Sequence, residues 1–195
     1  MGRVIVIEYI SLDGVIQDPG GGGGTSYGGW LYRFGPEPLE GDKFRLGEIM
    51  DNGALLLGRR TFEEFAALWP GRDDWFSARM NAWSKLVASR SLADASLWQN
   101  SELLDCDDLM KEVEARSKDT DIVVTGSLSV VRVLQAADLV DEYRLIVLPL
   151  VIGEGSRLFP DGTGPADLSL GLVETAGQGV RLIYSRKERV GGGSE

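Results

Sequence analysis

The sequence contains no histidine, and this absence excludes several kinds of active site. A Ser-His or Cys-His nucleophile system needs an imidazole as its general base, and a His-containing metal centre needs one as a ligand. Most hydrolase mechanisms are therefore excluded.

Cysteine and long apolar runs are also scarce. Cys106 is the only cysteine, so no internal disulfide can form, and its aspartate neighbours are expected to raise the thiol pKa and leave it unreactive. No basic-then-apolar leader precedes the first predicted strand, and no apolar run approaches the roughly 20 residues of a membrane span. We expect a reducing, cytoplasmic setting without a membrane partner.

Positive charge is in short supply, with 20 lysines and arginines against 30 aspartates and glutamates and a net charge of −10. Nucleic acids and anionic membranes need a basic face, so neither is an expected partner. An anionic small ligand would need a local cluster of arginines.

The chain is organised around residues 122–134. Ile122 to Val124 form a β-branched run, and the apolar residues that follow have the spacing of a helix face. The turn between them, Thr125-Gly126-Ser127, lets the backbone approach a ligand at a helix start, which suits a phosphate. The alternative is a plain strand-to-helix connection, for which Gly-Ser is simply a good cap.

Other apolar runs predict further elements of a largely parallel sheet. The run from Arg3 to Ile10 should be its central strand. Further strands are predicted at residues 54–57, 85–89, 96–99 and 144–149, with a closing hairpin at 168–175 and 180–186. Helices are predicted at residues 42–50, from 61 onward and at 107–116, the last with Leu109, Met110 and Val113 inward. Residues 75–83 should form either a short helix or an irregular segment.

Two more strand ends carry residues that suit an anion. Gly58, Arg59 and Arg60 follow a buried strand, and Thr61 and Glu64 have capping-box spacing, so a helix should begin there. Ser89 and Arg90 follow the next strand, where ligands bind in open α/β sheets. The alternative for both is a solvent-exposed loop or helix start.

The segment after the first strand combines a turn with a glycine run. Asp13-Gly14 signals a turn, and Gly20 to Gly24 predict either a mobile loop beside a ligand site or a disordered surface loop. Trp30 closes this segment and would be costly to leave in water, so it either covers a substrate or joins the core.

Together these motifs resemble the dihydrofolate reductase superfamily, especially the single-domain branch related to the reductase domain of bacterial riboflavin biosynthesis. The matching stretches occur in the family's order: residues 11–14, 28–30, 58–63, 89–90, 125–127, 140–142 and 153–159.

The resemblance implies a three-layer α/β/α fold with a mostly parallel mixed sheet of about eight strands, a C-terminal antiparallel hairpin and NADPH as cofactor. It implies that Gly58, Arg59 and Thr61 hold the cofactor phosphates and that Ser89 and Arg90 contact the 2′-phosphate. The turn Thr125-Gly126-Ser127-Leu128 resembles the Gly-Gly turn that binds the pyrophosphate, with Ser127 in place of the second glycine.

We therefore expect one domain over residues 1–190, followed by a flexible tail at 191–195, and an NADPH-dependent reductase of a small pterin-, pyrimidine- or flavin-like heterocycle. Asp13 is the candidate for orienting the substrate or relaying a proton, and a turn role is its alternative. Val15 stands where the riboflavin branch has lysine.

A catalytically silent NADP(H)-binding or sensing protein is the rival, and a purely structural module is a third possibility. The resemblance also implies a homodimer.

Overall fold

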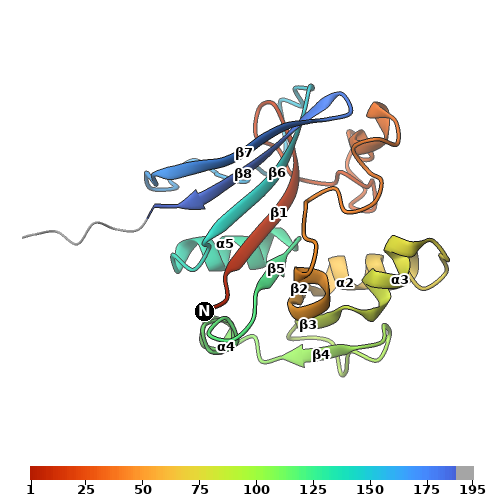
Figure 1. Ribbon diagram of the computed structural model, residues 1–195, viewed down its shortest axis with the longest axis vertical. Helices are drawn as coiled ribbons and strands as arrows, with labels where there is room; N and C mark the ends of the chain where they lie inside the picture. The colour runs from red at the N-terminus through yellow and green to blue at the C-terminus, as the bar shows by residue number, and fades with distance from the viewer. Residues whose placement is uncertain (188–195) are drawn as a thin grey trace, which may run out of the picture.

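The computed structural model describes residues 1–187. Eight strands form one sheet in the order β4-β3-β2-β5-β1-β6-β8-β7 (Figure 1). The strands are β1 Val4–Ser11, β2 Ala54–Gly58, β3 Ser84–Ala88, β4 Ser101–Leu104, β5 Ile122–Val124, β6 Glu142–Leu148, β7 Leu168–Ala176 and β8 Gly179–Arg186. The helices are a 3-10 turn at Trp30–Phe34, α1 Ile49–Asn52, α2 Arg59–Leu68, α3 Trp75–Ala82, α4 Leu109–Arg116 and α5 Leu128–Ala136.

In the order of the sheet, the strands β4, β3, β2, β5, β1 and β6 are all parallel. β8 and β7 close the sheet as an antiparallel hairpin. Parallel strands that follow one another in the chain need crossover connections. Helices lie in the connections from β2 to β3, from β4 to β5 and from β5 to β6, whereas a loop without a helix joins β3 to β4. This arrangement confirms the predicted dihydrofolate reductase-like fold class. The carboxyl ends of β3, β2, β5 and β1 consequently meet at one edge of the sheet.

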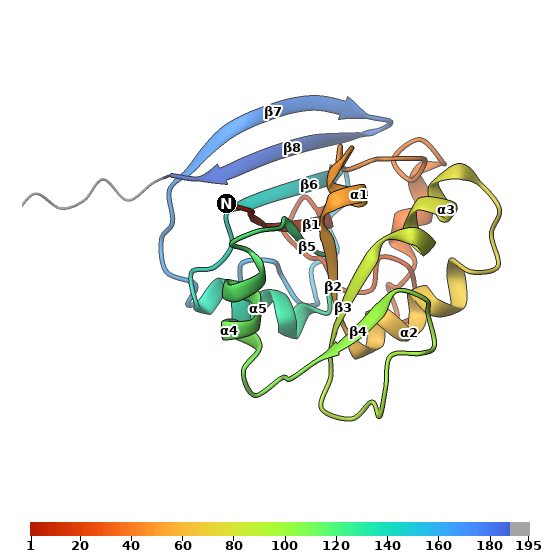
Figure 2. The same ribbon diagram turned by 60° about the horizontal axis from the view of Figure 1, so that its bottom comes forward.

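Helices cover both faces of the sheet. Side chains of α1, α2 and α3 join one apolar cluster, and those of α4 and α5 join the other, on opposite sides of the strands in Figure 2. Ile5 and Ile7 of β1 face the first cluster, while Val4 and Val6 face the second. The prediction of a central strand buried on both faces is confirmed, because β1 lies between β5 and β6.

The helix predicted at residues 42–50 is wrong over most of its length, since only α1 is helical there. The Asp42 carboxylate accepts hydrogen bonds from the backbone N–H groups of Leu46 and Gly47, both at 2.7 Å. Arg45 and Gly47 have φ of 56° and 52°. These positive angles interrupt a right-handed helix, so the apolar spacing here reflects a folded loop.

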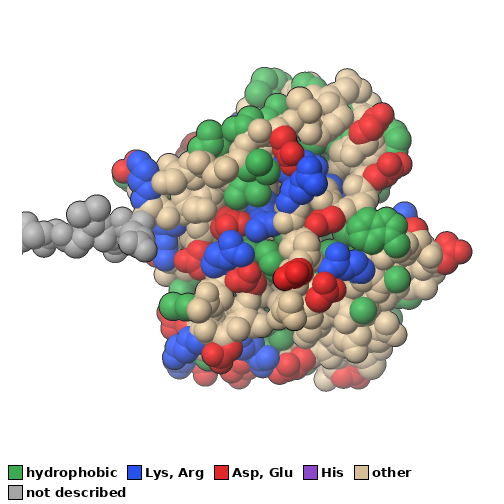
Figure 3. Space-filling view, in the orientation of Figure 1, with side chains coloured by type: hydrophobic (Ala, Val, Ile, Leu, Met, Phe, Trp, Pro, Cys, Tyr) green, Lys and Arg blue, Asp and Glu red, His purple; other side chains and the backbone are tan. Residues whose placement is uncertain are grey.

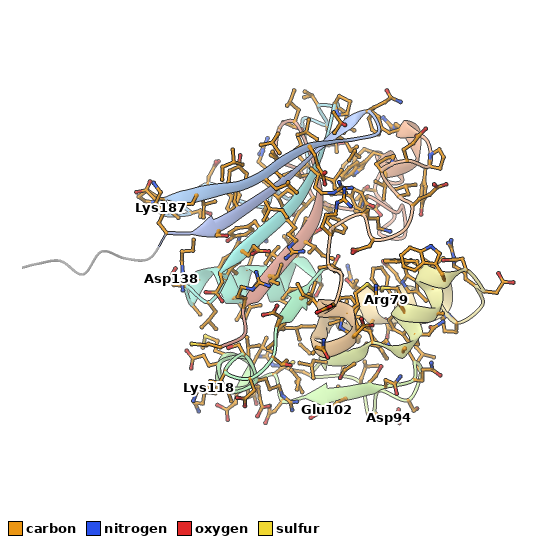
Figure 4. All side chains as sticks on the ribbon, viewed as in Figure 1. Arg79, Asp94, Glu102, Lys118, Asp138 and Lys187 are labelled. Carbon is orange, nitrogen blue, oxygen red and sulfur yellow. The ribbon has the colours of Figure 1, made fainter. Side chains whose placement is uncertain are left out.

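The strand predicted at residues 96–99 is also wrong, because β4 begins at Ser101. Ser96 turns the chain through a hydrogen bond from its N–H to Asp94 Oδ1 (2.9 Å), and the buried Trp98 donates its indole N–H to Asn81 Oδ1 (2.7 Å). Figure 4 labels Asp94, which lies in the loop before β4, and Glu102, which lies in β4. In α4, Leu109 and Val113 are buried as predicted.

Smaller differences concern single residues and strand ends. Met110 of α4 is 48% exposed, contrary to the prediction that it faces inward. The strand predicted from Arg144 begins at Glu142, because the backbone of Glu142 already pairs with Ile5 of β1 and Ser185 of β8. The predicted tail at residues 191–195 lies outside the described residues, and the single domain over 1–190 remains a prediction.

On the face seen in Figure 3, basic side chains are interspersed with acidic ones in the centre. Among residues 1–187, no helix is both long enough and apolar enough to cross a membrane.

Candidate functional site

The turns that follow β2 and β5 lie in contact with each other. Gly58 donates its backbone N–H to the carbonyl oxygen of Gly126 (3.3 Å). A Cβ atom on Gly58 would lie 1.9 Å from Ser127 Oγ, and one on Gly126 would lie 2.9 Å from Thr61 Oγ1. Gly126 also has a φ of +83° and precedes a cis peptide bond to Ser127. Close packing therefore requires glycine at both positions, and it brings four predicted site residues together.

Two helices begin at this contact, and neither start is neutralised by the chain. α2 and α5 have no side-chain hydrogen bond at the N-cap and no acidic residue in the first turn. In contrast, Asp74 caps α3 by accepting from the N–H groups of Phe76 (3.1 Å) and Ser77 (3.0 Å). First-turn N–H groups have no acceptor within their own helix, so these two starts are suited to an anion.

The capping box predicted from Thr61 and Glu64 does not form, because α2 begins at Arg59 with Gly58 as its N-cap. The Thr61 hydroxyl is thereby left beside Gly126. Thr125 and Leu128, on either side of the second turn, are half-buried, and Leu128 packs against the apolar cluster under α5.

The two arginines at the start of α2 are exposed. Arg59 Nη1 lies 3.4 Å from Glu63 Oε1, one turn along the helix. Arg60 lines a cavity of about 310 Å³ together with Gly22, Gly23, Glu63 and Glu64. The glycine run therefore lies next to one of the predicted phosphate sites.

The loop after β3 continues this edge of the sheet. Gly58 pairs in register with Ala88, so Ser89 and Arg90 follow at the strand end next to Arg59. The Ser89 hydroxyl accepts the N–H groups of Ser91 (3.1 Å) and Leu92 (3.0 Å), which shapes the loop. Ser89 and Arg90 line an open cavity of about 440 Å³.

The far side of this cavity comes from β4 and the residues after it, which the sequence analysis did not include in the site. The cavity is lined by Ser89, Arg90, Leu92, Leu103, Leu104, Asp105, Cys106 and Asp107. Cys106 is half-buried, and burial raises the pKa of its thiol; Arg90 opposes this shift, and Asp105 and Asp107 add to it. The direction is the predicted one, but burial is a larger cause than the aspartates. If β4 is placed at Ser101–Leu104, residues 105–107 follow its carboxyl end and lie beside Ser89 and Arg90, so the position of β4 is the signal that identifies this side of the cavity.

Asp13 lies at the end of β1 and joins two loops. Its carboxylate accepts hydrogen bonds from Ser11 Oγ (2.6 Å), Ile152 N (3.1 Å) and Gly153 N (2.8 Å). The Ser11 hydrogen bond, followed by those from the two backbone N–H groups, lowers the pKa of Asp13 to about 2. The side chain is therefore ionised at neutral pH and engaged in holding the turn.

Trp30 lies in the core rather than at the surface. Its side chain has no exposed area, and its indole N–H donates to the carbonyl oxygen of Gln17 (2.9 Å). The core role that the sequence left open thus fits its position, because the ring has no free face with which to cover a ligand.

The glycine run before Trp30 has a defined hydrogen-bonded shape. Asp18 accepts the N–H groups of Gly23 (2.7 Å) and Thr25 (3.0 Å) and the Thr25 hydroxyl (2.7 Å). A Cβ atom on Gly22 would lie 2.9 Å from Glu64 Oε1, so the loop packs closely on α2.

Comparisons with known proteins extend over nearly the whole chain. The uncharacterized protein YyaP of Bacillus subtilis (strain 168) is 30% identical over 189 residues, covering 93% of this chain and 94% of that protein. The uncharacterized protein YwjB of the same organism is 25% identical over 187 residues, covering 94% and 98%.

Solved structures share the fold. A protein of Shewanella sp. PV-4 assigned to riboflavin biosynthesis has a TM-score of 0.69 at 21% identity, covering 95% of this chain and 99% of that one. A pyrimidine reductase-like protein of Corynebacterium diphtheriae has a TM-score of 0.61 at 14% identity, covering 96% and 92%. Residues 3–182 match the family described as the RibD C-terminal domain. The chain therefore belongs to the RibD C-terminal domain family.

Proposed function

We propose that the protein is an NADPH-dependent reductase of a small planar heterocycle of the pterin, pyrimidine or flavin kind. The observation that carries the proposal is the contact between the turns after β2 and β5. Two helix starts without side-chain caps meet there, and glycine is required on both sides. Membership of a family with reductase-like members supports the same assignment.

The residues at this edge fit a phosphorylated dinucleotide. The N–H groups at the starts of α2 and α5, with Thr61 and Ser127 beside them, would hold the pyrophosphate. Arg59 is exposed next to them, and Ser89 and Arg90 border the cavity that would take the adenosine end. The nicotinamide ring, when bound, supplies the hydride.

The role of this chain is then to bind and to orient. Asp13 already accepts three hydrogen bonds, and they lower its pKa to about 2, which makes the carboxylate a weak proton acceptor. Of its two proposed roles, we therefore retain orientation. Asp13 would act as a positioning residue that keeps the loop after β6 in place next to the substrate.

Titration of the protein with NADPH and NADH, followed by cofactor fluorescence, tests the proposal. We expect saturable binding of NADPH. Equal and negligible binding of both dinucleotides would refute the assignment.

A second candidate is a protein that binds NADP(H) without turnover. It is favoured by Val15, which is completely buried at the position where the riboflavin branch has a lysine. The two candidates differ in NADPH oxidation, measured as loss of absorbance with a panel of pterin, pyrimidine and flavin substrates. Tight binding with no oxidation by any of them would favour the silent protein.

We also propose that the protein is a cytoplasmic homodimer, as the family resemblance and the single cysteine imply. Light scattering coupled to size-exclusion chromatography measures the mass directly. A mass near 21 kDa, that of the single chain, would contradict the dimer.

A further inference from the structure

The cavity after β3 and β4 carries more negative than positive charge. Of the residues that line it, Arg90 is the single cation, whereas Asp105 and Asp107 are anions. A phosphate monoester in this cavity would bring a further charge of about −1.5 to −2 at neutral pH. The cavity therefore has one cation to offer and two carboxylates that oppose such a ligand.

Arg90 is already engaged with one of these carboxylates. Its Nε atom lies 3.2 Å from Asp107 Oδ1, and the two side chains are 77% and 84% exposed. An exposed pair of this kind contributes little stability, so its main effect is on the charge that a ligand meets. A phosphate that binds Arg90 has to displace Asp107 or remain close to its negative charge.

The two aspartates differ in their freedom to move. Asp105 Oδ1 accepts the backbone N–H of Asp107 (2.9 Å), so Asp105 helps to form the turn that presents Asp107. Arg90 is the one hydrogen-bonding partner of the Asp107 carboxylate among residues 1–187. Asp107 is thus the carboxylate that can exchange between the guanidinium and a ligand hydroxyl.

We propose that Asp107 sets the dinucleotide preference of this site by weakening the hold of Arg90 on a 2′-phosphate. This inference rests on the proposed function. A carboxylate accepts hydrogen bonds from the ribose hydroxyls of NADH but repels the 2′-phosphate of NADPH. The wild-type protein consequently binds NADPH less tightly than its Ser89-Arg90 pair alone would allow.

The variant Asp107→Asn removes one negative charge while keeping the size of the side chain. Because the site is exposed and screened, we expect the Kd for NADPH to fall about fourfold to twentyfold. The Kd for NADH should stay within about twofold, since no phosphate lies at that position and the amide oxygen of asparagine can still accept from the ribose hydroxyls. The effect on NADPH should shrink at high salt.

The matched control is Asp108→Asn, which makes the same change in net charge one residue away. Asp108 pairs with Lys111 and does not line the cavity. Arg90→Ala is the complementary variant and should weaken NADPH more than NADH. Thermal unfolding of each variant verifies that it is folded before the titration.

The outcomes separate the two proposals. If wild-type protein binds neither dinucleotide, the proposed function fails and this inference fails with it. If the wild type binds but Asp107→Asn leaves the NADPH Kd unchanged, or shifts both dinucleotides equally, only the inference is overturned. Selective tightening of NADPH in Asp107→Asn, absent in Asp108→Asn, supports it.

Discussion

The position that a Cβ atom of residue 58 would occupy lies 1.9 Å from Ser127 Oγ and 3.1 Å from Ser127 N. Contact between the two turns thus depends on the missing side chain of Gly58. We expect Gly58→Ala to lower the free energy of unfolding by about 1–3 kcal/mol, because the added methyl group overpacks the contact. Urea unfolding measures this, and the variant should also bind NADPH more weakly.

A double-mutant cycle isolates the clash with the serine side chain. Ser127→Gly removes the Oγ and Cβ atoms that the new methyl group would meet, so Gly58→Ala should cost less in that background. If the two substitutions proved additive, the clash would lie with the backbone at Ser127 rather than with its side chain.

Asp13→Asn should destabilise the loop contact between β1 and the segment after β6. The amide cannot accept three hydrogen bonds as an ionised carboxylate does, so we expect a loss of about 1–2 kcal/mol in unfolding free energy at pH 7. The folded-state pKa is lowered to about 2 from an ordinary 3.8. The wild-type advantage is therefore present above about pH 4 and is lost as the pH falls toward 2.

Urea unfolding of both proteins at pH 7 and pH 3 checks this prediction. The difference between them should be smaller at pH 3. A constant difference would show that the carboxylate charge at Asp13 contributes nothing.

Glu8 provides a pH dependence of the opposite sign. It is 8% exposed on β1, and burial raises its pKa from an ordinary 4.5 to about 8. Folding then favours the protonated acid, so stability falls as the pH rises from about 4.5 to about 8. Glu8→Gln removes this cost, and we expect it to gain about 2–5 kcal/mol relative to wild type at pH 8, with little gain at pH 5.

Thermal unfolding of wild type and Glu8→Gln at these two pH values is the measurement. Asp13 and the other carboxyls of lowered pKa titrate at more acidic pH, so they do not confuse the comparison. A gain that is equal at both pH values would contradict a buried carboxyl at Glu8.

Cys106 offers a direct report on the cavity, because it is the only cysteine and lines the proposed adenosine end. Its raised thiol pKa predicts slow modification, so the reaction is best followed with a disulfide reagent at pH 8. At NADPH ten times above its Kd the rate should fall about tenfold, since only free protein reacts. Nicotinamide mononucleotide, which lacks the adenosine, should not protect, and protection by it would place the adenosine elsewhere.

The strands and turns nearest to the site could be predicted because their signals are local. β-branched residues, as at 122–124, favour strands, and glycine, as at 58 and 126, favours tight turns. These preferences depend on the residue type alone. The prediction is wrong over most of residues 42–50 and at 96–99, where the apolar side chains belong to loops. There, carboxylates such as Asp42 and Asp94 bind nearby backbone N–H groups and turn the chain instead.

The residue types alone reveal that the protein lacks an imidazole and a second cysteine, and they reveal which strand ends carry glycine and arginine. The partners of those residues are set by the folding of distant segments against each other. Asp13 and Gly153 are 140 residues apart, and Arg90 meets Asp107 only because β4 pairs with β3. Such contacts depend on strand order and register, which apolar spacing along the chain does not specify. For this reason, the place of Asp105 and Asp107 beside the cavity and the complete burial of Trp30 are visible only in the folded chain.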